Sequence, residues 1–209
     1  MNYQSLIGTL FIISAPSGSG KTSICHEIRS IIPGLIFSVS YTTRAKRKGE
    51  KDGEDYFYIS LETFKKMIEK GKFLEWAQVH GHYYGTSKEF ITEKISQGLD
   101  CLLDIDIFGA RRLKQIYPNG IFIFVIPPSL QELKSRLSRR KTECQKEIHL
   151  RMENAISELW AFEEYHYLII NDDFSRAVEE LKSIILAERC KIQKRRSLIL
   201  DIIKSQAHR

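Results

Sequence analysis

The segment SAPSGSGKTS (Ser14–Ser23) restricts the possible folds of this chain more than any other, because of what lies on either side of it. The apolar run Leu10–Ile13 before it predicts a buried strand. Isoleucines at helical spacing after it predict a helix that ends at Pro33-Gly34. Glycines between a strand and a helix let several backbone N–H groups converge on one anion, and the helix N-terminus adds positive potential. The segment therefore predicts an α/β fold with a phosphate site.

The same residues match the P-loop pattern GxxxxGK[ST] at every position except the first, where Ala15 replaces glycine. In this pattern Lys21 reaches the β- and γ-phosphates of a nucleoside triphosphate, and the Thr22 hydroxyl ligates Mg²⁺. A serine- and glycine-rich turn that holds a lysine by chance is the alternative, and the flanking strand and helix argue against it. The predicted ATP-binding residues are Ala15, Pro16, Ser17, Gly18, Ser19, Gly20, Lys21 and Thr22.

Strand and helix signals alternate along the rest of the chain. The continuous apolar runs Cys101–Ile105 and Ile121–Ile126 are typical of central parallel strands, and Tyr167–Ile170 is the last clear strand. We expect a parallel-sheet core with helices on both faces and a ligand site at the carboxyl ends of the strands. The pattern also indicates an insertion between the first helix and the third strand.

Local signals predict four further features. Phe37–Tyr41 is expected to form one short strand, and Gly81–Gly85 a turn. Thr86–Glu89 fits a capping box at the start of a helix. A long final helix is expected from Ser175 to about Lys204, with a break near Lys194–Ser197. The apolar stripe on its last part is expected to pack on the core, with self-association as the alternative.

Composition narrows the function classes without deciding among them. The net charge is +6 and the pI about 9.1, which suits nucleic acid, a membrane surface or a small polyanionic ligand. No apolar stretch approaches the ~20 residues of a membrane span, and no signal peptide is recognisable at the N-terminus. The four cysteines form no CxxC pair, so we expect reduced thiols and a cytoplasmic location.

The predicted insertion holds residues suited to a phosphate and to a base. Arg44 and Arg47 supply two guanidinium groups, and Tyr56 and Tyr84 supply two phenols, a suitable set for a phosphate dianion. A carboxylate at Glu75 can accept hydrogen bonds from N1–H and N2–H₂ of guanine, a donor pair that adenine lacks. Each residue has a structural alternative: Glu75 as a surface carboxylate, and the tyrosines as ordinary sheet residues.

Two carboxylates follow the apolar run that begins at Cys101. Asp104 and Asp106 are two residues apart, so on a strand both side chains would face the same way. We expect Asp104 to lie near Mg²⁺ and Asp106 to face the acceptor. The alternative is that one of them caps the turn into Phe108-Gly109.

Five stretches together resemble the guanylate kinase family. They are SAPSGSGKTS (Ser14–Ser23), FSVSYTTRAKRKGEKDGEDYFY (Phe37–Tyr58), FLEWAQVHGHYYGTS (Phe73–Ser87), CLLDIDIFGA (Cys101–Ala110) and IINDD (Ile169–Asp173). The resemblance implies a single domain over 6–188, with a core of 6–38, 87–128 and 156–188, a mixed α/β GMP-binding insertion of 39–86, a small helical lid of 129–155 and a helical tail of 189–209. It implies that the GMP-binding residues are Ser40, Arg44, Arg47, Tyr56, Glu75, Tyr84, Thr86, Asp104 and Asp106. Thr86 has the strongest alternative, as the cap of the following helix.

The stretch from Arg136 to Arg151 resembles the lid of these kinases. The resemblance implies that Arg140 and Arg151 reach the transferring phosphoryl group, with Arg136 as a third, less certain arginine. It also places Asn171 at the adenine of ATP. Lys141 stands where many relatives have glycine, which affects the lid backbone rather than its charge. The alternative for the whole stretch is a solvated basic hairpin.

The resemblance implies transfer of the γ-phosphoryl group of ATP to GMP, with Mg²⁺ and with Lys21, Arg44, Arg140 and Arg151 as the catalytic residues. The expected ligands are ATP and GMP, with dGMP as a further acceptor, and neither nucleic acid nor a membrane is expected as a partner. Three alternatives stay open: a non-catalytic interaction module of the same fold, a nucleic-acid binder, and a kinase for another monophosphate. Monomer and homo-oligomer are equally open.

Overall fold

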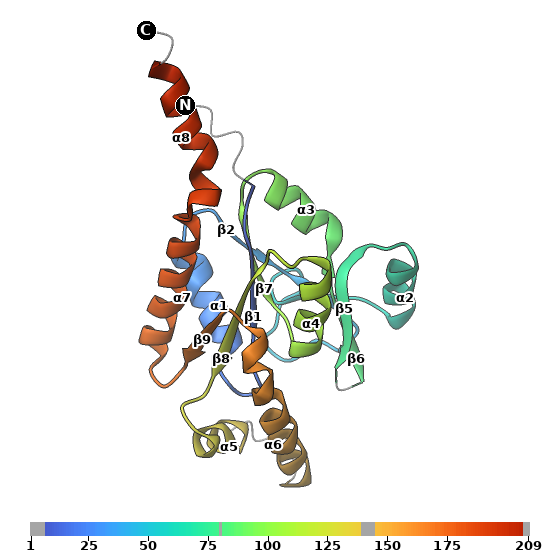
Figure 1. The fold of residues 1–209 in the computed structure, drawn as a ribbon. Coiled ribbons are helices and arrows are strands. Elements are labelled where there is room, and N and C mark those ends of the chain that lie inside the picture. The colour runs from blue at the N-terminus through green and yellow to red at the C-terminus, as the bar shows by residue number, and fades with distance from the viewer. Residues whose placement is uncertain (1–6, 80, 139–144, 207–209) are drawn as a thin grey trace.

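The computed structural model describes residues 7–79, 81–138 and 145–206, and its centre is a five-stranded sheet (Figure 1). The strand order is β2-β7-β1-β8-β9, and every neighbouring pair is parallel. The strands are β1 (Leu10–Ser14), β2 (Leu35–Ser38), β7 (Asp100–Asp104), β8 (Ile121–Ile126) and β9 (Tyr167–Ile170). The carboxyl ends of β1 and β7 therefore lie side by side, which places the segment after Ser14 next to Asp104.

Helices cover both faces of this sheet because each central strand is apolar on both sides. Phe11 and Ile13 of β1 pack against α1 (Lys21–Ile31) and α7 (Phe174–Arg189). Leu10 and Ile12 point to the opposite face, toward α3 (Lys88–Ser96) and α4 (Ile107–Ile116). The predicted fold class, a parallel α/β core with helices on both faces, is confirmed.

A second, mixed sheet is formed entirely from residues 40–87. Its order is β4-β3-β6-β5, with β3 parallel to β4 and antiparallel to β6. The strands are β3 (Ser40–Thr42), β4 (Tyr56–Tyr58), β5 (Phe73–Val79) and β6 (His82–Ser87). The helix α2 (Leu61–Glu69) packs on it through Phe64, whose ring stacks on that of Phe73 with centroids 4.4 Å apart. This sheet lies inside the predicted insertion of 39–86 except for Ser87, the last residue of β6.

Two helices and a short 3-10 helix lie at one end of the molecule, beyond the P-loop (Figure 1). They are α5 (Leu130–Ser138), α6 (Gln145–Leu159) and η1 (Trp160–Glu164). α5 and α6 pack together through a small apolar cluster of Leu133, Leu137, Met152 and Ala155. Both helices fall within or beside the predicted lid.

Three local predictions were wrong. Residues 37–41 do not form one strand, because β2 ends at Ser38 in the central sheet and β3 begins at Ser40 in the second sheet. Gly81–Gly85 is not simply a turn, since the antiparallel strand β6 begins at His82. The cap of α3 is Ser87, whose hydroxyl accepts the Phe90 N–H, and not Thr86, which lies in β6.

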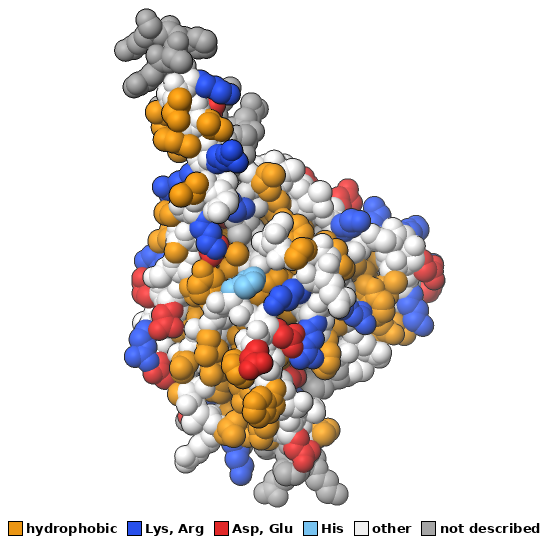
Figure 2. Space-filling view, in the orientation of Figure 1, with side chains coloured by type: hydrophobic (Ala, Val, Ile, Leu, Met, Phe, Trp, Pro, Cys, Tyr) orange, Lys and Arg blue, Asp and Glu red, His pale blue; other side chains and the backbone are white. Residues whose placement is uncertain are grey.

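The C-terminal prediction was wrong in two respects. The break falls at Cys190-Lys191, earlier than expected, between α7 and α8 (Ile192–Gln206). The apolar residues of α8 do not pack on the core: Ile192 is 79% exposed and Ile203 is 58% exposed. Figure 2 shows hydrophobic and basic side chains together along this projecting helix. Its base is attached by Lys194, whose ammonium donates to the carbonyl of Ile7 at 3.2 Å.

Within the described residues, no helix is both long and apolar enough to cross a bilayer.

Candidate active site

The P-loop adopts a conformation that only glycine takes without strain at two positions. Gly18 has φ of 92° and Gly20 has φ of 87°, and α1 begins immediately afterwards at Lys21. A Cβ at Gly20 would also lie 2.4 Å from Nδ2 of Asn171. The chain thus directs the first N–H groups of α1 toward the carboxyl ends of β1 and β7, as an anion site requires.

Lys21 points to the end of β7 rather than to solvent. Its ammonium donates to the carbonyl of Ile105 at 2.7 Å and forms an ion pair with Asp104. Burial works against the charge, but the neighbouring Asp104 outweighs it, so the pKa of Lys21 lies above its ordinary value. The lysine is a full cation at any physiological pH, available to phosphate oxygens.

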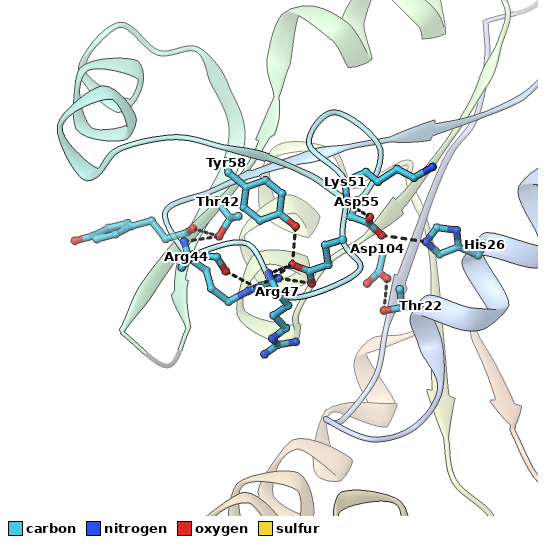
Figure 3. Close-up of polar contacts among 12 residues, drawn as sticks. Thr22, His26, Thr42, Arg44, Arg47, Lys51, Asp55, Tyr58 and Asp104 are labelled. Carbon is cyan, nitrogen blue, oxygen red and sulfur yellow. Dashed lines mark hydrogen bonds and ion pairs between the residues drawn. The ribbon is translucent and has the colours of Figure 1, made fainter. Parts of the chain in front are cut away.

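Thr22 and Asp104 together form a pair of hard oxygen donors. The Thr22 hydroxyl donates to Oδ2 of Asp104 at 3.0 Å, and Figure 3 shows the two side chains facing each other across the end of β7. Hydroxyl and carboxylate oxygens fit Mg²⁺, which takes one or two protein ligands and completes its shell with water and phosphate. The described residues contain no cluster of three or more His, Cys, Asp or Glu side chains that could hold a metal ion.

Asn171 and Arg136 support the P-loop from its other side. Nδ2 of Asn171 donates to the Ser19 carbonyl at 2.7 Å, and Nη2 of Arg136 donates to the Asn171 carbonyl at 2.9 Å. Arg136 also pairs with Glu132 at 2.8 Å. Asn171, predicted at the adenine of ATP, therefore holds the P-loop backbone in this structure, and Arg136, the less certain lid arginine, holds Asn171.

A buried carboxylate lies on β5 of the second sheet, beside α4. Glu75 is 5% exposed, and Oε1 accepts a 2.7 Å hydrogen bond from the hydroxyl of Thr86 on the neighbouring strand β6. Burial raises the pKa of Glu75 to about 7, against the effect of the Thr86 hydrogen bond. A Cβ at Gly109 would come within 2.7 Å of Oε2, so α4 approaches this carboxylate closely. The alternative in which Glu75 is a surface residue is wrong.

Asp104 and Asp106 do not lie on one strand, so the prediction that their side chains face the same way along a strand is wrong. β7 ends at Asp104, and Asp106 is the N-cap of α4. Oδ1 of Asp106 accepts the N–H groups of Phe108 at 2.8 Å and of Gly109 at 3.0 Å. The capping alternative is therefore correct for Asp106, although this residue also lines a cavity that runs from the P-loop to Glu75.

The predicted phosphate cradle contains two residues that the sequence argument missed. The Arg44 guanidinium donates to both carboxylate oxygens of Glu50, at 2.8 and 3.1 Å, and the Tyr58 hydroxyl donates to Oε2 at 2.7 Å (Figure 3). Burial opposes the charge of Glu50, but these hydrogen bonds outweigh it and lower its pKa to about 2. The guanidinium also lies over the Tyr56 ring, 5.3 Å from its centroid. The spacing of Tyr56 and Tyr58, two apart on one strand, was the only sequence signal for this second tyrosine.

Two adjoining cavities bring these residues together. One, of about 360 Å³, lies between α1 and the second sheet and is lined by Arg44, Glu50 and their neighbours. The other, of about 320 Å³, runs from the P-loop to Glu75. They share Thr22, Ser40, Arg47, Tyr56 and Asp104. Most of the predicted triphosphate and monophosphate residues therefore line these two cavities, which together make one hollow. Arg44 lines the first cavity, Arg151 the second, and Arg47 both.

Of the remaining predicted residues, two line the cavity that reaches Glu75 and one lies outside the described part of the chain. Tyr84 lines the cavity that reaches Glu75, and its ring meets that of Tyr56 edge to face with centroids 5.9 Å apart. Arg151, on α6, lines the same cavity beside the P-loop. Arg140 lies outside the described residues, so its role stays a prediction.

Comparisons with known proteins agree with this geometry. The family model for guanylate kinase matches residues 8–188. The chain belongs to the guanylate kinase family. It is 52% identical to the guanylate kinase of Geobacter metallireducens, over 88% of this chain and 91% of the relative. It is 46% identical to that of Thermotoga maritima, over 92% and 93%. The crystal structure of guanylate kinase from Anaplasma phagocytophilum superposes with a TM-score of 0.76 at 30% identity, covering 88% of each chain.

Proposed function

We propose that this hollow binds ATP and GMP together and that the chain is an enzyme which transfers the γ-phosphoryl group of ATP to GMP, giving ADP and GDP. The observation that carries the proposal is the continuous cavity between Lys21, at the P-loop, and the buried Glu75. A P-loop alone is shared by many reactions, whereas a buried carboxylate at the far end selects the acceptor.

Guanine recognition is assigned to Glu75, with Thr86 and Ser40 beside it. The Glu75 carboxylate can accept hydrogen bonds from both N1–H and N2–H₂ of guanine, and Thr86 already orients it at 2.7 Å. Adenine presents an acceptor at N1 and no amino group at C2, so it would leave the buried carboxylate unpaired. Sites that pair a ligand's polar groups reject analogues lacking them by up to ~10⁴–10⁵.

The phosphate of GMP is assigned to Arg44, Arg47, Tyr56 and Tyr84. As a phosphate monoester its second pKa lies near ~6, so it is mostly a dianion at neutral pH and needs no general base. The main obstacle to transfer is the repulsion between two polyanions. Lys21, the cradle arginines and the lid residues Arg140 and Arg151 would offset this repulsion and align the groups.

Mg²⁺ is assigned to Thr22 and Asp104, whose oxygens lie 3.0 Å apart. When bound, the ion supplies positive charge to the phosphates of ATP. Lys21 would exchange part of its interaction with Asp104 for phosphate oxygens, because all three side chains meet at the end of β7.

A cytoplasmic location and use of dGMP as a second acceptor remain proposals. The free thiols of Cys25, Cys101 and Cys190 support a reducing compartment. We expect dGMP to be accepted as well as GMP. Monomer and homo-oligomer remain alternatives.

The test is ADP formation from Mg-ATP with GMP, dGMP, AMP, UMP, dTMP or no acceptor. We expect rapid turnover with GMP and dGMP only, and loss of GMP turnover in Glu75→Ala. ADP formation that does not exceed the no-acceptor rate with any nucleotide would exclude the kinase assignment and favour an interaction module.

A further inference from the structure

Arg112 connects the core to the second sheet beside the proposed guanine reader. It is an exposed residue of α4, and its Nη1 donates to the carbonyl of Trp76 on β5 at 2.5 Å. The same guanidinium lies over the Trp76 indole, with Cζ 4.8 Å from the ring centroid. One arginine therefore holds both the main chain and the ring of the residue that follows Glu75.

α4 approaches β5 at two points that are one helical turn apart. A Cβ at Gly109 would come within 2.7 Å of Oε2 of Glu75, and Arg112 follows three residues later, on the same face of the helix. Among the described strands, β5 is the edge strand of the second sheet and pairs with β6 alone. A strand with one paired neighbour depends on other contacts along its free side. The contact of Arg112 with Trp76 therefore fixes the position of Glu75 relative to α4.

The charge of Arg112 also acts on the Glu75 carboxylate. Burial raises the pKa of Glu75, and Asp106 at the N-terminus of α4 raises it further. The hydrogen bond from Thr86 on β6 and the charge of Arg112 lower it, which leaves the pKa at about 7. Arg112 therefore offsets Asp106 in favour of the charged carboxylate.

Other charged groups surround Glu75 from the remaining elements. The charged residues of α3, which also packs on β5, are Lys88, Glu89, Glu93 and Lys94. Glu89 pairs with Lys72 at 3.5 Å, and Glu93 with Lys94 at 2.8 Å. The cavity in front of Glu75 adds Lys21, Arg47, Asp104, Arg151 and Glu158, with Tyr56 and Tyr84 as further titratable groups. All of these groups are kept when Arg112 alone is replaced, so variants of Arg112 isolate its contribution.

Guanine recognition requires the charged form of Glu75. N1–H and N2–H₂ are two donors side by side, and a carboxylate offers an acceptor oxygen to each. A protonated carboxyl group instead turns a hydroxyl hydrogen toward one of them. GMP binding should therefore strengthen as pH rises through the pKa of Glu75, in addition to the effect of the phosphate of GMP, which titrates near ~6.

We propose that Arg112 is a positioning residue for guanine recognition, which holds β5 to α4 at Trp76 and places a positive charge beside the guanine reader. Arg112 is not among the residues that line either cavity, so it acts through Glu75 rather than on GMP itself. The proposal rests on the guanine-binding role of Glu75 proposed above.

Two substitutions separate the geometry of Arg112 from its charge. Arg112→Lys keeps the charge but loses the planar group that stacks on Trp76 while bonding its carbonyl. Arg112→Met loses the charge as well. Arg111→Met is the matched control, because it removes a neighbouring charge from α4 whose Nε lies 2.9 Å from both carboxylate oxygens of Glu164, away from β5.

The experiment measures the Kd for GMP by titration calorimetry between pH 6 and pH 8.5, with the thermal midpoint and the KM for ATP of each variant. At pH 7 we expect a Kd about threefold to tenfold above wild type in both Arg112 variants. The midpoint of the pH dependence should rise by ~0.5 unit in Arg112→Met and stay unchanged in Arg112→Lys. Arg111→Met should match wild type, and the KM for ATP should stay within twofold throughout.

The pH dependence identifies Glu75 as the group through which Arg112 acts. The titration of GMP is common to all the proteins, so it cancels in each comparison with wild type. In a Glu75→Gln background, Arg112→Met should leave the pH dependence unchanged, because glutamine does not titrate. Should Arg112→Met fail to fold, Arg112→Gln removes the same charge and replaces it in the comparison.

Four results would overturn the inference: a Kd for GMP within twofold of wild type in Arg112→Met, a midpoint that does not move in this variant, an Arg112→Lys variant that binds as wild type does, or an equal loss in Arg111→Met. Wild type that does not bind GMP is a different failure, because it rejects the guanine-binding role itself. Normal GMP binding by wild type together with unaffected Arg112 variants rejects only the role of Arg112.

Discussion

The guanidinium of Arg44 forms a bidentate ion pair with the carboxylate of Glu50, with Nη2 2.8 Å from Oε1 and Nη1 3.1 Å from Oε2. The same carboxylate accepts the backbone N–H of Arg47 at 2.7 Å. Both arginines of the proposed phosphate cradle are therefore held by one acid before any ligand arrives. Such preorganisation reduces the entropy that binding must overcome.

Replacing Glu50 should weaken GMP binding. Glu50→Gln removes the charge that orients Arg44, and a hydrogen bond to a charged group contributes ~1.5–3 kcal/mol. We expect the KM for GMP to rise about tenfold or more, with the KM for ATP nearly constant, in steady-state assays. Glu54→Gln, at an exposed position of the same loop, is the control. An unchanged KM for GMP would show that Arg44 is positioned without Glu50.

The buried Glu75 should make stability depend on pH. Its pKa of about 7 in the folded chain exceeds the ordinary value of 4.5, so between these values the folded state binds more protons than the unfolded state. The free energy of unfolding therefore falls as pH rises from 4.5 to 7, by up to about 3 kcal/mol.

This dependence is measured by denaturant unfolding of wild type and Glu75→Gln at pH 5 and pH 8. Because glutamine does not titrate, the variant should gain stability relative to wild type as pH rises. A difference between the two proteins that is the same at both pH values would contradict the raised pKa.

Gly20 should not tolerate a side chain. Gly20→Ala forces alanine to φ near 87° and places its Cβ 2.4 Å from Nδ2 of Asn171, so the P-loop must shift. We expect kcat/KM for ATP to fall by ~10²-fold or more. Gly49→Ala is the matched control, since its φ is 92° but nothing lies within 4 Å of the added carbon. If both variants lose activity equally, backbone strain alone explains the loss.

Removal of α8 should cost little stability. A chain that ends at Lys191 loses residues whose apolar side chains are mostly exposed, and it loses the contacts of Lys194 with Ile7 and Gly8. We expect a thermal midpoint within ~4 °C of the full chain and unchanged kcat. A drop of 10 °C or more would show that α8 is covered in solution, and sedimentation of both proteins would then identify self-association.

The sequence predicted best what depends on neighbours along the chain. The P-loop could be read because its strand, glycines, lysine and helix are contiguous. The metal-site role of Asp104 followed from its place at the end of an apolar run, whereas the role of Thr86 needed the family resemblance. Thr86 meets Glu75 only because β5 and β6 pair antiparallel. Glu50 and Tyr58 were missed because the hydrogen bonds that Glu50 accepts from Arg44 and Tyr58 close a loop whose conformation has no periodic signal.

For the C-terminal tail, the sequence predicted a contact that the structure does not contain. Its apolar residues at helical spacing predicted packing on the core, but the break at Cys190-Lys191 directs α8 away from the sheet, where that face has no described partner (Figure 1). The periodicity of apolar residues shows that a helix has an apolar face. The packing partner of that face depends on the direction in which the helix leaves the domain.

The second sheet joins the core at two places, Val39 between β2 and β3 and the junction of Ser87 with Lys88. Within the described residues, the two sheets share no strand pairing, so rotation of the lobe about the line that joins these connections would leave the pairing within each sheet intact. Ser40 and Thr86 each lie one residue from these pivots, so the base-reading end of the lobe would travel least. Arg44 and Arg47, which lie beyond the end of β3, would move farther than Ser40 and Thr86 in such a rotation.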